Sequence, residues 1–147
     1  MTWDRATKAA AAAIGAVAGY FGKWDATMTV LAVVMAVDYA SGLLVAACGR
    51  SPKTPEGGLS SRAGFMGIAR KGVIMLIVLL AALLDRAVGG AQAFRTGAAM
   101  YYIANEGLSI LENAALLDVP FPAKLRGALE ELKSGEKKSG SQGESDQ

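Results

Sequence analysis

Residues 26–48 read ATMTVLAVVMAVDYASGLLVAAC, and Asp38 carries the only charge among them. A transmembrane helix needs about 20 predominantly apolar residues to cross the hydrocarbon core of a bilayer. This segment meets that requirement, so we predict that it forms a membrane-spanning helix. Asp38 falls near its middle, which places a carboxyl group close to the bilayer midplane.

Two later windows extend this prediction along the chain. Residues 72–84, GVIMLIVLLAALL, are uncharged, but as a helix they reach only about 20 Å. We therefore predict a span over 72–90, which carries Asp85 and Arg86 to an interface where the pair is hydrated or pairs with itself. Residues 96–117 contain asparagine and glutamate on a broadly apolar helix and form a further predicted span.

The N-terminal window, residues 6–22, is rich in alanine and only weakly hydrophobic. It could span the membrane, lie in the interface or be a signal sequence, and we favour an uncleaved helix because aromatic residues follow it. Gly15 and Gly19 form a GxxxG step that suits close helix packing, although alanine-rich sequence produces this spacing by chance as readily. The predicted fold class is an all-α polytopic membrane protein with three to four transmembrane helices.

The chain changes character after residue 117. Pro120 and Pro122 end the preceding helix, and residues 123–133 place leucines at helical spacing among charged residues. We predict a short amphipathic helix there, at the membrane surface or against a partner. It completes a single helical membrane domain over residues 1–133. Residues 134–147 are mostly glycine, serine and charged residues, and we predict a disordered polar tail.

Basic residues decide the predicted orientation. The segment 49–71 has a single acidic residue, Glu56, and five basic ones: Arg50, Lys53, Arg62, Arg70 and Lys71. Cytoplasmic loops next to membrane spans carry an excess of lysine and arginine. We therefore predict that the basic loop 49–71 and the C-terminus face the cytoplasm.

Polar residues inside the predicted spans form two stripes at helical spacing. The first stripe lies in residues 26–48 and consists of Asp38, Ser41 and Gly42. The second lies in residues 96–117 and consists of Asn105, Ser109, Glu112 and Asn113, with Glu106 at its edge. A charge near the midplane costs about 2.5–3.5 kcal/mol, so each carboxyl group must be protonated, hydrogen-bonded to a neighbouring helix or hydrated. No lysine or arginine lies at that depth in the four windows.

These stripes admit several interpretations. They hold the helix bundle together, or they form contacts between subunits that later line an aqueous opening. A role in proton relay or ion coordination is a further alternative. We predict that the eight stripe residues are oligomer contacts or pore-lining residues, and that Gly15 and Gly19 serve helix packing.

Composition excludes most other classes of protein. The chain has no histidine and one cysteine, Cys48, so it lacks the commonest general base and metal ligand and cannot form an internal disulfide. No nucleophile has a plausible base, so we predict that the chain is not an enzyme and has no catalytic residues, no cofactor and no metal. A net charge of +2 is too small to predict nucleic-acid binding.

Three motifs carry a family resemblance. Residues 102–115, YIANEGLSILENAA, with VPFPAKL at 119–125 and ALEEL at 128–132, resemble the C-terminal signature of the phage lysis and toxin-secretion holin family. Residues 38–42, DYASG, are similar to its D-Y-x-[ST]-G element, and residues 59–71, LSSRAGFMGIARK, to its basic loop. The chain departs from the pattern at Asp118, where the family signature has glycine.

The resemblance implies a small protein of the bacterial cytoplasmic membrane that accumulates as a homo-oligomer. At a set time it would open lesions that let an endolysin or a large toxin cross, which leads to lysis or release. Its implied functional partner is an endolysin, with an antiholin as a second candidate partner. Two alternatives stay open: a small ion-conducting channel or transporter subunit, and a secreted soluble helical protein after signal cleavage.

Overall fold

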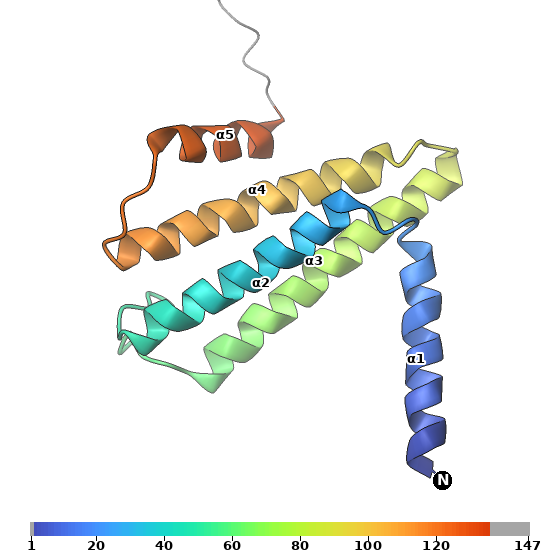
Figure 1. Cartoon of the computed structure of the whole chain (residues 1–147), viewed down its shortest axis with the longest axis horizontal. Helices are drawn as coiled ribbons and strands as arrows, with labels where there is room; N and C mark the ends of the chain where they lie inside the picture. Colours follow the sequence, from blue (N-terminus) through green and yellow to red (C-terminus); the bar gives the residue numbers. More distant parts are fainter. Residues whose placement is uncertain (1, 136–147) are drawn as a thin grey trace, which may run out of the picture.

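A computed structural model describes residues 2–135 of the chain. Helices joined by turns and loops are the only regular secondary structure in this range. The elements are α1 (Thr2–Tyr20), α2 (Ala26–Ala47), α3 (Ser61–Val88), α4 (Ala93–Leu116) and α5 (Ala123–Ser134). Helices α2, α3 and α4 lie side by side, α1 points away from them, and α5 folds back along α4 (Figure 1). The all-α prediction is confirmed, and most of the predicted tail lies outside the described residues.

Two of the described helices, α2 and α3, are long and apolar enough to cross a membrane. Their outward surfaces carry large exposed hydrophobic side chains, including Val33, Leu76 and Leu80. A soluble domain buries such a surface, whereas a membrane helix presents it to lipid. The core between the helices is small and consists of Phe21, Met28, Leu31, Met35, Ile74, Val78 and Ala99.

The predicted start of the third apolar segment is wrong, because α3 begins at Ser61 rather than near residue 72. The Ser60 side chain caps the helix by accepting a hydrogen bond from the Ala63 N–H at 3.4 Å. Gly64 and Gly67 then lie against Tyr39 of α2, where an added Cβ would be 3.4 Å and 3.2 Å from that side chain. Small residues at these positions let α2 and α3 approach closely. Half of the predicted basic loop is therefore helix.

The expectation that Asp85 is hydrated or pairs with Arg86 is also wrong, although Arg86 is exposed. Asp85 is buried and accepts hydrogen bonds from the N–H groups of Phe94 and Arg95 at 3.1 Å and 2.8 Å, so it caps the first turn of α4. The residue that precedes α4, Gln92, makes no side-chain cap. Arg86 instead donates to the Gly19 carbonyl at 2.6 Å. Unpaired helix N–H groups need an acceptor, and here the preceding helix supplies it.

Helix α5 packs on α4 of the same chain. Gly107 makes room for the Leu129 side chain, which lies 3.0 Å from where a Cβ of residue 107 would be. The Lys133 ammonium lies 5.9 Å from the centre of the Tyr101 ring, so α5 returns along more than half of α4. The amphipathic helix predicted over 123–133 is present, and its apolar side covers α4.

The turn before α5 explains the departure at Asp118. Asp118 has φ 59°, in the left-handed region that favours glycine. Its carboxylate accepts a hydrogen bond from Arg50 at 2.5 Å, and Arg50 also donates to the Leu116 carbonyl at 3.0 Å. Asp118 raises the pKa of Arg50 through this hydrogen bond. Both side chains are more than half exposed, so the pair contributes little stability.

Candidate functional site

A buried ion cluster joins the three central helices. Lys71 of α3 donates from Nζ to Asp38 Oδ2 of α2 at 2.7 Å and also to Glu106 Oε2 of α4. The side chains of Lys71, Asp38 and Glu106 are 16%, 11% and 4% exposed. One cation therefore serves two carboxylates that are largely removed from solvent. Each of the three central helices contributes one charged member.

An amide network extends this ion cluster toward the end of α2. Asn113 of α4 donates from Nδ2 to the Ser41 hydroxyl at 2.8 Å and lies 3.4 Å from Asp38 Oδ1. The Ser41 hydroxyl in turn donates to the Asp38 carbonyl at 3.0 Å. The described buried side chains leave no nitrogen or oxygen atom without a partner. Hydrogen bonding of this completeness is what a low-dielectric site requires.

A pocket of about 120 Å³ borders the cluster. Its lining includes Asp38, Gly42, Asn105, Glu106 and Ser109, all of them stripe residues, together with Lys71. Asp38, Glu106 and the Ser41–Asn113 pair therefore lie around one polar centre. The helical spacing brings the two stripes face to face, as a bundle requires.

Three of the residues singled out in the sequence lie elsewhere. Glu112 is exposed and points away from the buried centre, although its neighbour Asn113 is buried. Gly15 and Gly19 have open space where a Cβ would be, so no other helix of the described chain packs against that side of α1, although Arg86 reaches the Gly19 carbonyl. Their role in helix packing stays a prediction, for contact with another protein.

Sequence reasoning missed Lys71. The sequence pattern places it at the end of the predicted cytoplasmic loop, and the four predicted windows contain no lysine at the depth of Asp38 and Glu106. Because α3 begins at Ser61, Lys71 lies about three turns inside the helix. One signal in the sequence points to Lys71. Asp38 and Glu106 have no cation at their depth in the predicted windows, and two buried carboxyl groups require one nearby.

A second buried cation lies at the opposite end of α4. Arg95 is 2% exposed and donates to the Phe21 carbonyl at 3.1 Å, to the Lys23 carbonyl at 2.8 Å and to the Asp25 carboxylate. Asp25 also caps α2 by accepting from the Met28 N–H at 3.0 Å. This N–H and the Arg95 guanidinium outweigh burial and lower the pKa of Asp25 below its ordinary 3.8. Among residues 2–135, no group of acidic or cysteine side chains is arranged to hold a metal ion.

The helices carry exposed apolar side chains on their outer surfaces and charged side chains buried between them. This arrangement is typical of a helical membrane protein. The family model of the bacteriophage holin family matches residues 15–134. An uncharacterized 14.9 kDa protein of Clostridium perfringens is 43% identical over 113 residues, which are 76% of this chain and 80% of that protein. Uncharacterized protein Lmo0128 of Listeria monocytogenes is 37% identical over 125 residues, 83% of this chain and 84% of the relative.

A relative from a phage carries a functional name. The probable holin of Bacillus phage phi105 is 38% identical over 78 residues, 52% of this chain and 56% of the phage protein. No solved structure matches the chain. The chain belongs to the bacteriophage holin family, as its motifs had indicated. This is a family of pore-forming membrane proteins rather than of enzymes.

Proposed function

We propose that this protein is a holin that oligomerises in the cytoplasmic membrane and forms timed lesions through which an endolysin or a large toxin crosses. The observation that carries the proposal is the ion cluster of Lys71, Asp38 and Glu106, closed within a single chain of the holin family. In the closed packing these charges are shielded by protein. In an open assembly the same side chains would line water.

The mechanism is a difference in stability between two packings. Charges from three helices satisfy one another only while those helices stay together. When neighbouring copies supply other contacts, the helices can separate provided that water reaches the freed carboxylates. The small pocket beside the cluster supports this step because it already borders Asp38 and Glu106.

The proposed topology places α4 in the membrane beside α2 and α3, with α1 as a fourth span or an interfacial helix. Contacts at both ends support this placement of α4. Arg95 reaches Asp25 at the start of α2, and Arg50, just after α2, reaches the Leu116 carbonyl at the end of α4. The charged side of α5 then lies beside the spans, so in an assembly it would face water or another copy rather than lipid. The 49–60 loop would face the cytoplasm.

Inducible expression in a bacterium that carries a folded cytosolic reporter enzyme tests the proposal. We expect an abrupt loss of viability with release of the reporter, and lysis when an endolysin without a signal sequence is co-expressed. Loss of potassium with the reporter fully retained would contradict it. That result would favour a small ion-conducting channel or transporter subunit, for which buried carboxylates are also expected.

Asp38→Asn and Glu106→Gln test the role of the ion cluster in timing. Each removes one charge that Lys71 balances, so the closed packing changes in stability and the onset of lysis shifts. Glu130→Gln is the matched control because Glu130 is exposed and forms a surface ion pair with Arg126. An unchanged onset in both cluster variants would overturn this part of the proposal.

A further inference from the structure

The five cations of residues 49–71 divide into two groups. Lys71 pairs with Asp38 and Glu106, and Arg50 pairs with Asp118. The remaining three are Lys53, Arg62 and Arg70, which are exposed and form no salt bridge with any acidic group of residues 2–135. A count of positive charge is enough to orient a loop, but it does not require these three to lie together.

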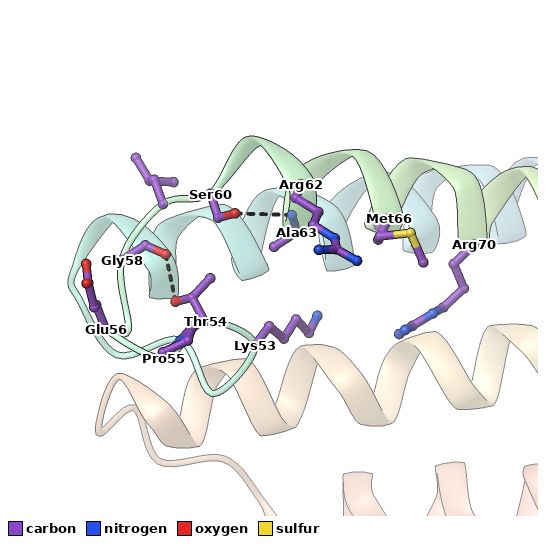
Figure 2. A pocket seen from close by; sticks show the side chains of 12 residues that line it. Lys53, Thr54, Pro55, Glu56, Gly58, Ser60, Arg62, Ala63, Met66 and Arg70 are labelled. Carbon is purple, nitrogen blue, oxygen red and sulfur yellow. Dashed lines mark hydrogen bonds between the residues drawn. The ribbon is translucent and has the colours of Figure 1, made fainter.

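All three line one pocket of about 660 Å³ between the 53–60 loop and the first turns of α3. Figure 2 shows the Lys53 ammonium and the guanidinium groups of Arg62 and Arg70 directed into the same space. Glu56 is the only acidic residue of the lining, and it lies toward the far end of the loop from Arg70 (Figure 2). The pocket is therefore strongly positive at one end and open.

The other part of the pocket rim is apolar. Leu59 and Met66 belong to the lining and are 66% and 54% exposed, and Phe65 and Ile68 in the same turns of α3 are exposed hydrophobic residues as well. Helix α3 has 28 residues, about 42 Å, which matches a bilayer with its headgroup regions. Its first turns then lie at headgroup depth. Arg70 lies deeper, and its side chain points back toward the loop, as a snorkelling arginine does.

We propose that this pocket binds the phosphate of an anionic phospholipid in the leaflet that faces the 49–60 loop. Two arginine forks and an ammonium match a phosphate group in charge and hydrogen bonding. Basic pockets beside transmembrane helices are typical sites for such headgroups. The apolar rim accommodates the start of the acyl chains, which a free phosphate ion does not have. The inference requires only that α3 lies in a membrane.

The test uses the purified protein in an uncharged detergent with added phosphatidylglycerol or phosphatidylcholine. Bound lipid is counted by native mass spectrometry, and the unfolding temperature is recorded in parallel. We expect phosphatidylglycerol to remain bound and to raise the unfolding temperature, whereas phosphatidylcholine does neither. In K53Q/R62Q/R70Q the affinity for phosphatidylglycerol falls about a hundredfold, since each cation near a membrane surface is worth about fivefold.

The matched control is R5Q/K23Q/K124Q, which removes the same charge from exposed positions outside the pocket. It should bind phosphatidylglycerol as the unaltered protein does. An equal loss in both triple variants, or equal binding of the two lipids, would overturn the proposal. Inorganic phosphate that raises the unfolding temperature as much as the lipid would assign the pocket to a soluble anion instead. Should the triple variant not fold, R62Q replaces it beside K124Q, with an expected loss of about fivefold.

Discussion

The molecule holds two buried cations in different ways. Lys71 is held by side chains alone, the carboxylates of Asp38 and Glu106 on two other helices. Arg95 is held mainly by backbone, because two of its acceptors are the carbonyls of Phe21 and Lys23 in the turn between α1 and α2. Both cations join segments that are far apart in the sequence.

We infer from this difference that the two ends of the bundle separate with different ease. Arg95 leaves the two carbonyls only if the turn changes conformation or the start of α4 moves away from it, and Asp85 of α3 holds the start of α4 in place. Side chains can leave Lys71 when helices move apart, because water replaces each partner without any change in backbone conformation. We therefore expect the Lys71 end of the bundle to separate during the proposed lesion formation and the Arg95 end to hold the bundle together.

The largest effect is expected for Lys71→Met. This change leaves two carboxylates buried without a cation, and breaking a buried ion pair costs about 3–5 kcal/mol. The free energy of unfolding, measured in mixed micelles with a denaturing detergent, should fall by that amount. In K71M/D38N/E106Q no charge remains to be balanced, so most of the lost stability should return.

Lys124→Met is the control for this measurement because Lys124 is exposed on α5. It should leave the free energy of unfolding within about 0.5 kcal/mol of the unaltered protein. A Lys71→Met variant as stable as this control would show that the ion cluster contributes nothing to the closed packing.

A smaller effect is expected for Arg95→Met. The change leaves the carbonyls of Phe21 and Lys23 without their donor, and unsatisfied buried groups cost about 1–3 kcal/mol. Asp25 keeps 38% of its side chain exposed, so water can serve it. Unfolding in the same micelles measures the loss. If the comparison of the two cations holds, this variant loses stability without a shift in the onset of lysis, whereas a shift as large as that of the Lys71 variant would contradict it.

Much of the fold follows from residue patterns that a sequence displays directly. The apolar run at 26–48 and the prolines after residue 117 place α2 and the start of α5 correctly. The polar stripes on α2 and α4 are predictable because helical period and residue polarity can be read from the local sequence, and in the structure these stripes face each other. The sequence does not predict that Glu112 is exposed, because the angle of about 100° per residue around a helix shows which residues share a side. It does not show how much of that side the neighbouring helices cover.

Both buried cations were missed for a shared physical reason. Lys71 and Arg95 stand beside apolar runs, where a basic residue normally marks the membrane edge. Their true positions depend on tertiary partners: Tyr39 against Gly67 lets α3 start early, and Asp85 caps α4. Such contacts between distant segments leave no periodic trace in a single sequence. The convergence of Lys53, Arg62 and Arg70 on one pocket depends on such contacts too, so the sequence alone does not predict it.

The smallest effect is expected for Asp25→Asn. The pKa of Asp25 is below its ordinary 3.8 because the Met28 N–H and Arg95 favour the charged form. A lowered pKa in the folded state gives stability that is present above pH 3.8 and is lost as the pH falls through the folded pKa. Asparagine still caps α2 but binds no proton.

Unfolding temperatures between about pH 2.5 and 6 measure this contribution. The stabilising charge is present only above the folded pKa. The unfolding temperature of the unaltered protein should therefore be higher than that of Asp25→Asn near pH 6, and the difference between the two temperatures should shrink as the pH falls. Asp4→Asn is the control, since the ion pair of Asp4 with Lys8 is exposed. A constant gap across the range would contradict this prediction, because it would mean that the charge of Asp25 contributes no stability through either the Met28 N–H or Arg95.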